Sequence, residues 1–211
     1  MVHTRCFRYL VCLLVLFLLQ ELQVFDRQQP RDAGPYPAAS FQGVSLRNAR
    51  ERRISRYDFL LKKYAERIGM DWRLLAAIVY HESKFDEQAL SPVGAKGLMQ
   101  VMDIAAVHYG LPEADLYDPE TNIALGTILL EDLFEQFARE GVADEDIVRF
   151  ALASYNVGGG ALARRRAEAD SLGLDPNSWA DVATIFDRDD HSTPSYIAAV
   201  ESTYVKYCNR Y

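Results

Sequence analysis

Residues 71 to 100 read DWRLLAAIVYHESKFDEQALSPVGAKGLMQ, an apolar helix pattern followed by a stretch rich in turn residues. Leu75, Val79 and Glu82 recur at spacings of four and three, so they share one face of a 3.6-residue helix. That face is otherwise apolar, which directs Glu82 toward the core. Burying an ionised carboxylate without a partner is costly. We therefore expect the pKa of Glu82 to be raised toward neutrality, where a carboxyl can protonate an oxygen leaving group.

Glu82 has a second interpretation, in which the side chain turns to solvent at the end of the helix and has no chemical role. The segment that follows favours chemistry, because residues 91–97, SPVGAKG, form a turn-rich link to another apolar stretch that begins at Leu98. Glycines in such a link let the backbone approach a ligand closely. The pattern predicts a single acid beside a glycine loop.

Composition limits the possible partners. The 211 residues can form one domain with a substantial core, and the formal net charge of −7 argues against a nucleic-acid partner. We expect the compact basic run at residues 164–166 to be a solvated helix face. The cysteines (Cys6, Cys12, Cys208) and the histidines have no metal-ligand spacing. We expect no metal, no cofactor and a monomeric protein.

The N-terminus carries an export signal. Arg5 and Arg8 precede an apolar run, residues 9–19, which fits a secretory signal and is short for a membrane span of about 20 residues. No small-residue cleavage site follows promptly, so residues 1–25 are a signal peptide or an uncleaved membrane anchor. Residues 26–50 have no hydrophobic period and are interpreted as a linker. We expect a periplasmic protein, membrane-anchored if the segment is retained, whose folded domain is residues 51–211.

The folded domain is predicted to be all-α, because apolar residues recur at helical spacing and no pair of strand patterns is convincing. Helices are expected over residues 54–68, 72–83, 98–108, 120–138, 144–155 and 195–207. Asp71, Asp118-Pro119 and Thr193-Pro194 are helix-start signals. Four glycines fall just past helix patterns, where left-handed caps are common: Gly69, Gly110, Gly141 and Gly158.

Other side chains could join Glu82. Residues 151–160, ALASYNVGGG, place Tyr155 and Asn156 at a helix end, where a hydroxyl and an amide suit a sugar or an N-acetyl group. The alternative is that Tyr155 packs in the core and Asn156 only helps to end the helix. Tyr196, in the first turn of the last helix, could reach a neighbouring carboxyl.

A paired-carboxylate mechanism is also conceivable from the sequence. Asp86 and Glu87 lie close to Glu82, and a glycosidase can use two such groups. Both residues fall in a stretch that we expect to be an exposed loop. The single-acid interpretation is therefore favoured.

The chain resembles the lysozyme-like lytic transglycosylases of the soluble lytic transglycosylase type. Four motifs carry the resemblance in the family's order: Glu82-Ser83, Gly97-Leu98-Met99-Gln100, Ala153-Ser154-Tyr155-Asn156 and Tyr196. Within the family, residues 71–78 and 173–182 are most similar to the catalytic domain of membrane-bound lytic murein transglycosylase F. The resemblance covers roughly residues 57–207 and implies a lysozyme-like α-helical domain with a substrate cleft.

The resemblance implies cleavage of the β-1,4 bond between N-acetylmuramic acid and N-acetylglucosamine in peptidoglycan, which leaves a 1,6-anhydromuramic end. Glu82 would be the sole acid and base. The implied substrate-binding residues are Ser83, Ser91, Gln100, Tyr155, Asn156 and Tyr196, the last of which would hydrogen-bond the catalytic carboxyl. Two alternatives remain at this point, a goose-type lysozyme that uses water and a non-catalytic peptidoglycan-binding scaffold of a secretion system.

The sequence departs from the family in two places. His81 stands where the family has glutamine, on a different helix face from Glu82. The family member that it most resembles has a solute-binding-like module ahead of the domain, where this chain has the predicted signal and linker. The acidic residues 187–191 are interpreted as a loop, either simple or gating the substrate.

Overall fold

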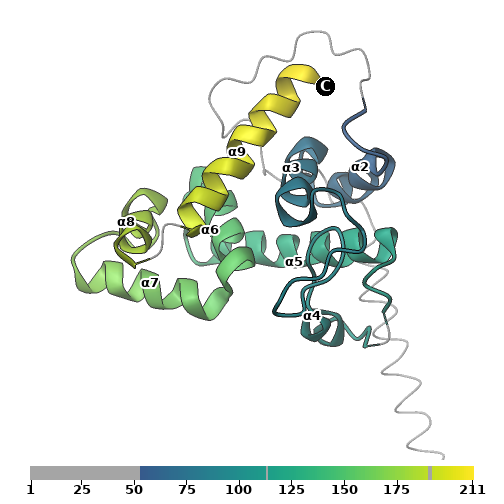
Figure 1. Ribbon diagram of the computed structural model, residues 1–211. Coiled ribbons are helices and arrows are strands. Elements are labelled where there is room, and N and C mark those ends of the chain that lie inside the picture. Colours follow the sequence, from purple (N-terminus) through teal and green to yellow (C-terminus); the bar gives the residue numbers. More distant parts are fainter. Residues whose placement is uncertain (1–52, 113, 190–191) are drawn as a thin grey trace, which may run out of the picture.

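The computed structural model describes residues 53–112, 114–189 and 192–211, so the predicted signal segment and linker lie outside the described residues. The described helices are α2 (Asp58–Arg67), α3 (Trp72–Ser83), α4 (Asp103–His108), α5 (Pro119–Arg139), α6 (Asp144–Val157), α7 (Gly159–Ser171), α8 (Trp179–Asp189) and α9 (Ser192–Arg210) (Figure 1). Isolated bridges join Lys96 to Leu90 and to Val101, and these ranges contain no strand. The all-α prediction is confirmed.

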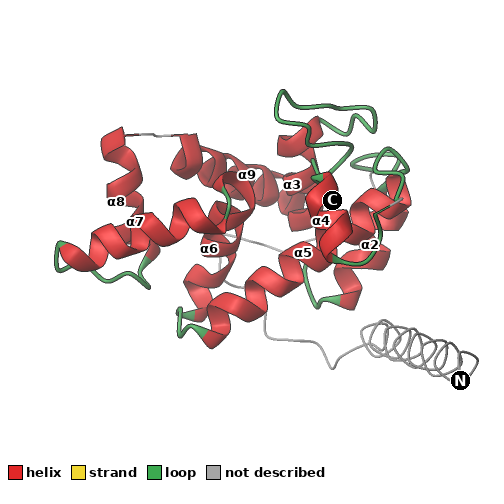
Figure 2. Cartoon of the chain, turned by 90° about the horizontal axis from the view of Figure 1, so that it is seen from below, coloured by secondary structure: helices red, strands yellow, loops and turns green. Residues whose placement is uncertain are grey.

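The helices gather in two groups joined by longer ones. In both views α7 and α8 lie together at one end, α2, α3 and α4 lie at the other, and α5 runs between the two ends (Figures 1 and 2). Helix α3 packs against α2 and α9, and α5 packs against α6. The centre is apolar and aromatic, with fully buried Ile78, Phe134, Phe150 and Tyr204. In the described part of the chain, the helices are too short or too polar to cross a bilayer.

Local capping explains where the predicted helices begin and end. Asp71 accepts a hydrogen bond from the Arg73 amide at 2.8 Å, and Asp118 accepts one from the Thr121 amide at 2.8 Å. Such a cap stabilises a helix by about 1 kcal/mol. The four cap glycines have positive φ, from 66° to 83°. Helix α9 begins at Ser192, so Pro194 lies in its first turn, where a missing N–H costs nothing.

The predicted helix over residues 98–108 is wrong in its first half. Residues 98–102 form a turn and a bridge, and only α4 is helical. Gly97 and Gln100 have left-handed φ values of 71° and 51°, which stop helix propagation. The Met99 amide donates to the side chain of Asn122 instead of a carbonyl one turn back.

Helix α8 was not predicted, and of α7 only the basic run at residues 164–166 was expected to be helical. Helix α7 begins with glycines and buries only Leu162 and Ala169 among its residues, so its apolar period is weak. Helix α8 buries Val182, Ile185 and Phe186, whose helical spacing is visible in the sequence. The interpretation of residues 187–191 as a loop is wrong for residues 187–189, which belong to α8.

The basic run at residues 164–166 is not a uniformly solvated face. Arg166 is partly buried, with its guanidinium 5.6 Å from the Phe137 ring centroid and 5.3 Å from that of Phe150. It donates to the Pro176 carbonyl at 2.9 Å and pairs with Glu140. Arg166 therefore joins α7 to the end of α5 and to the loop before α8. These contacts help to explain why α7 forms although it buries few apolar side chains.

Candidate active site

Glu82 lies in the last turn of α3, partly buried against α9. The hydroxyl of Tyr196 donates to Glu82 Oε1 at 2.5 Å. Burial raises the pKa of Glu82, while the bond from Tyr196 and the charge of Lys84 act in the lowering direction without reversing the shift. Burial also raises the pKa of the Tyr196 phenol well above its usual value, so Tyr196 remains a donor. The sequence prediction of a carboxyl with a raised pKa at this position is confirmed in direction.

Helices α3 and α9 run antiparallel, and a tyrosine–carboxyl hydrogen bond joins them at each end of their contact. Near the start of α3, Asp71 Oδ2 accepts a hydrogen bond from the Tyr204 hydroxyl at 3.2 Å. At the other end, Tyr196 meets Glu82. Each bond joins a carboxyl group at one end of α3, Asp71 at its N-cap and Glu82 in its last turn, to a tyrosine of α9. The site therefore rests on two packed helices, which position a side chain more accurately than loops do.

A sharp turn follows Glu82. Lys84 and Phe85 have left-handed φ values of 56° and 64°, although neither is glycine. Left-handed backbone costs a residue with a β-carbon about 1–2 kcal/mol, and such strain is common at functional sites. The turn ends α3 and sends the chain back over the helix as the loop that carries Ser91 and Gly97.

Ser83 and Tyr155 hold this returning loop. Ser83 is buried, with its Oγ 2.8 Å from the Leu98 carbonyl and 3.2 Å from that of Val79. Tyr155, on α6, donates its hydroxyl to the Met99 carbonyl at 2.6 Å. Burial raises the pKa of Tyr155 well above its usual value, and the nearby charge of Glu82 acts in the same direction. Tyr155 therefore lies within reach of the charge of Glu82. The Ser83 hydroxyl is bonded within the protein.

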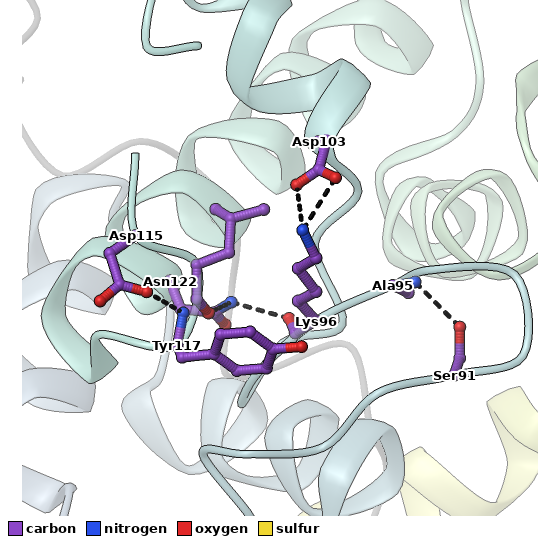
Figure 3. A network of polar contacts seen from close by, with 8 residues as sticks. Ser91, Ala95, Lys96, Asp103, Asp115, Tyr117 and Asn122 are labelled. Atoms are coloured by element: carbon purple, nitrogen blue, oxygen red, sulfur yellow. Dashed lines mark hydrogen bonds and ion pairs between the residues drawn. The ribbon is translucent and has the colours of Figure 1, made fainter. Parts of the chain in front are cut away.

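Asn122, near the start of α5, binds the backbone of the same loop, and the sequence analysis did not predict this role. It is fully buried, accepts from the Met99 amide at 2.7 Å and donates to the Leu116 carbonyl at 2.8 Å. It also donates to the Lys96 carbonyl at 2.8 Å (Figure 3). One amide thereby satisfies three backbone groups of two separate segments. The available signal was a polar residue directly before Ile123 in an apolar helix pattern.

Two glycines make the close approach of loop and helix possible. A β-carbon on Gly97, whose φ is 71°, would lie 2.4 Å from the Leu116 carbonyl oxygen and 2.5 Å from Asn122 Nδ2. A β-carbon on Gly126 would lie 2.6 Å from the sulfur of Met99. These distances are shorter than atoms tolerate, so both positions require glycine. Gly97 of the loop and Gly126 of α5 therefore serve the close packing of the loop against α5.

Gln100 and Ser91 stiffen the loop from within. Gln100 Nε2 donates to the Gly97 carbonyl at 3.1 Å. The Ala95 amide donates to Ser91 Oγ at 2.9 Å (Figure 3). The Lys96 ammonium pairs with Asp103 at 2.7 Å at the start of α4. Both predicted residues therefore lie in the loop packed against Ser83, and the contacts of their side chains shape it.

Asn156 is exposed near the end of α6. Its Oδ1 accepts a hydrogen bond from the Thr193 hydroxyl at 3.0 Å, which joins α6 to the first turn of α9. With the oxygen engaged, the amide nitrogen is the end available to donate to a ligand. Asn156 is therefore the predicted residue best placed to contact an exposed acetamido or hydroxyl group.

The alternative pairing of Glu82 with Asp86 or Glu87 is not supported. Glu87 accepts from the Tyr57 hydroxyl at 2.5 Å and pairs with Arg56 at 3.1 Å, and Asp86 accepts from the Gln88 amide at 2.9 Å. The groups that shift the pKa of Glu82 include no second carboxylate. Across the described ranges, no three His, Cys, Asp or Glu side chains gather in a way that could hold a metal ion.

The fold is that of a lysozyme-like helical domain, and its candidate site contains one partly buried glutamate that is bound by a tyrosine. The chain belongs to the Transglycosylase SLT domain family, whose model matches residues 59–176. It is 34% identical over 179 residues to membrane-bound lytic murein transglycosylase F of Desulfosudis oleivorans, covering 81% of this chain and 38% of that protein. It is 42% identical over 132 residues to the protein of the same name from Marinobacter nauticus, covering 63% and 26%.

Solved structures agree with this assignment. The inactive glutamate-to-glutamine mutant of lytic transglycosylase Slt from Pseudomonas aeruginosa has a TM-score of 0.56 at 25% identity, covering 73% of this chain and 24% of that one. The 70 kDa soluble lytic transglycosylase of Escherichia coli has a TM-score of 0.52 at 28% identity, covering 73% and 25%. This chain therefore spans about a quarter to two fifths of the length of these relatives.

Proposed function

We propose that this protein is a peptidoglycan lytic transglycosylase that cleaves the bond between N-acetylmuramic acid and N-acetylglucosamine and leaves a 1,6-anhydromuramic end. The observation that carries the proposal is the single, partly buried Glu82, whose carboxyl is held by the Tyr196 hydroxyl at 2.5 Å. The names of the relatives support it, as does the inactivity of a glutamate-to-glutamine mutant of one of them.

In the proposed reaction Glu82 acts first as an acid. The protonated carboxyl gives its proton to the glycosidic oxygen while the bond from that oxygen to C1 of the muramic residue breaks. The leaving sugar departs as an alcohol, and C1 acquires oxocarbenium character. The raised pKa of Glu82 suits this step because it keeps the proton on the carboxyl at higher pH.

Glu82 then acts as a base. The carboxylate takes the proton of the muramic C6 hydroxyl while O6 bonds to C1 and closes the anhydro ring. Glu82 regains its proton, and water is neither consumed nor released. The bond from Tyr196 stabilises the intervening carboxylate, because a hydrogen bond to the charged form favours that form.

The remaining predicted side chains have two proposed roles, which are contact with the glycan and stabilisation of the loop beside Glu82. Asn156 is proposed to donate its amide to the acetamido or hydroxyl groups of the glycan, and Tyr155 to border the reacting sugars. Ser83, Ser91 and Gln100 are proposed to act through the loop, since their side chains bind its backbone. If these three side chains also contact the substrate directly, they do so with donors and acceptors that the loop bonds leave unused.

The proposed location follows from the substrate. We infer that the protein acts on glycan strands in the periplasm, exported by residues 1–25 as a signal peptide or retained by them as an anchor. A monomer suffices, because the described acid, the tyrosine that binds it and the loop come from one chain. No nucleic acid, metal or cofactor enters the proposed reaction.

Mass spectrometry of muropeptides released from purified peptidoglycan tests the proposal. The purified full chain should release anhydromuramyl products, and the Glu82→Gln variant should release none while remaining folded. Glu87→Gln is the matched control, since Glu87 binds Tyr57 and Arg56 and should be dispensable for cleavage. Products heavier by one water would indicate a lysozyme. Cleavage by Glu82→Gln would refute the assignment, and no products from the wild type would favour a binding scaffold.

A further inference from the structure

His81 contacts the tyrosine that binds the proposed acid. It directly precedes Glu82 on α3, is partly buried, and places Nε2 2.8 Å from the Thr203 hydroxyl of α9. Its ring meets the Tyr196 ring edge-on, with the centroids 6.5 Å apart and the planes at 87°. The Tyr80 ring lies edge-on to it as well, with the centroids 5.2 Å apart.

We propose that His81 is a positioning residue that fixes Tyr196 against Glu82 by binding α9 at two places, an inference that rests on the proposed function. Thr203 follows Tyr196 by seven residues, which is two helical turns, so both project from the same face of α9. A polar bond at Thr203 and a ring contact at Tyr196 together define the distance and rotation of α9 relative to α3. The Tyr196 hydroxyl is thereby placed on the carboxyl.

The contact is that of a neutral imidazole. Burial lowers the pKa of His81, and the charge of Lys84 acts in the same direction against a smaller opposing effect of the Ala199 backbone. A neutral ring has one donor and one acceptor nitrogen, and either can pair with a hydroxyl. His81 therefore contributes geometry and does not supply a proton. His81 bonds the Thr203 hydroxyl and contacts the Tyr80 and Tyr196 rings. We infer that it acts on Glu82 through Tyr196.

The variants His81→Leu and His81→Gln separate the polar contact from the volume. Leucine fills the space without a bond, whereas the glutamine amide can bind Thr203. We expect His81→Leu to lower kcat on a soluble glycan oligomer by about tenfold to a hundredfold, the effect of a displaced catalytic contact, with KM unchanged. The His81→Gln variant should retain most of the wild-type kcat. The alkaline limb of the kcat profile should move to higher pH in His81→Leu, because Tyr196 no longer lowers the pKa of Glu82.

Two controls make the outcome specific. Thr127→Val removes a buried side-chain hydrogen bond to the Ile123 carbonyl on α5 and should cost stability without changing kcat. In a Tyr196→Phe background, adding His81→Leu should change kcat little, since its route to Glu82 is already lost. Thr203→Val removes the same bond from α9 and serves if His81→Leu does not fold.

The proposal fails if wild-type kcat survives in His81→Leu, or in Thr203→Val where the leucine variant does not fold. It also fails if the His81→Leu loss is undiminished in the Tyr196→Phe background. Failure of the proposed function would appear separately, as cleavage by Glu82→Gln or as products that lack the anhydro ring.

Discussion

Replacing Asn122 with aspartate tests whether this buried amide holds the loop beside Glu82. The substitution keeps the shape and the acceptor for the Met99 amide, but it removes both hydrogens that now bind the Lys96 and Leu116 carbonyls at 2.8 Å. The ionised form would place a charge against two carbonyl oxygens in a site that is closed to solvent. The native state should therefore favour the protonated aspartic acid, which regains one of the two donors.

The expected loss can be worked out from these contacts. Each buried carbonyl left without a donor costs about 1–3 kcal/mol. The ionised form leaves both carbonyls unpaired, which costs about 2–6 kcal/mol at neutral pH, whereas the protonated form leaves one unpaired and costs about 1–3 kcal/mol at low pH. The folded pKa of the new aspartate lies above its unfolded value of about 3.9. Between those values the native state binds more protons than the unfolded state, so the free energy of unfolding falls as pH rises, by at most about 1.4 kcal/mol per unit. The loss should be smallest below about pH 4.

Urea unfolding of the wild type and of Asn122→Asp between pH 4 and pH 8 measures both quantities. Thr127→Val is the matched control, because Thr127 is buried on the same helix and donates only to the Ile123 carbonyl, at 2.6 Å. It should cost about 1 kcal/mol at every pH. A loss in Asn122→Asp below about 1 kcal/mol at pH 7, or one that does not depend on pH, would refute the reasoning.

Three further predictions concern the same site. Gly97→Ala should destabilise the fold by clearly more than the about 1–2 kcal/mol of left-handed strain, since its β-carbon would lie 2.4 Å from a backbone oxygen; Gly94→Ala, with φ 89° and open space, should cost only that strain, as urea unfolding would show. Tyr196→Phe should lower kcat by about tenfold to a hundredfold, from a lost charged hydrogen bond, and move the alkaline limb of the kcat profile upward. Glu82→Gln should be at least as stable as the wild type at pH 7 by calorimetry, since the raised pKa of Glu82 makes wild-type stability fall as pH rises above about 4.3; a less stable variant would contradict the burial argument.

The helices that the sequence predicted are those whose stability is local or strongly periodic. The residues 72–83 have both a cap at Asp71 and an apolar face, and α3 has those bounds. Helix α7 lacks such a face and depends on Arg166, whose partners Glu140 and Phe137 lie on another helix or just past its end. Pattern reasoning weighs neighbours three and four residues away and has no access to such contacts.

The site divides in the same way. Glu82 and Tyr155 were proposed as site candidates from local patterns, because each lies at the end of an apolar helix. Asn122 was missed because its partners, Lys96 and Met99, are more than twenty residues earlier and are backbone groups that have no sequence signature. The Ser83 hydroxyl was expected on the ligand and is found on the Leu98 carbonyl, because the loop folds back over it.

The structure also explains why one carboxyl can serve both halves of the proposed reaction. An acid needs a raised pKa, and burial of Glu82 between α3 and α9 provides it. A base needs its carboxylate stabilised after the first proton transfer, and Tyr196 provides that stabilisation at 2.5 Å. The two effects oppose each other on the same group, so the pKa is held between the values that either would give alone. A second carboxylate nearby would raise the pKa further and hinder the return to the charged form, and the bonds of Glu87 to Tyr57 and Arg56 hold that neighbouring carboxylate elsewhere.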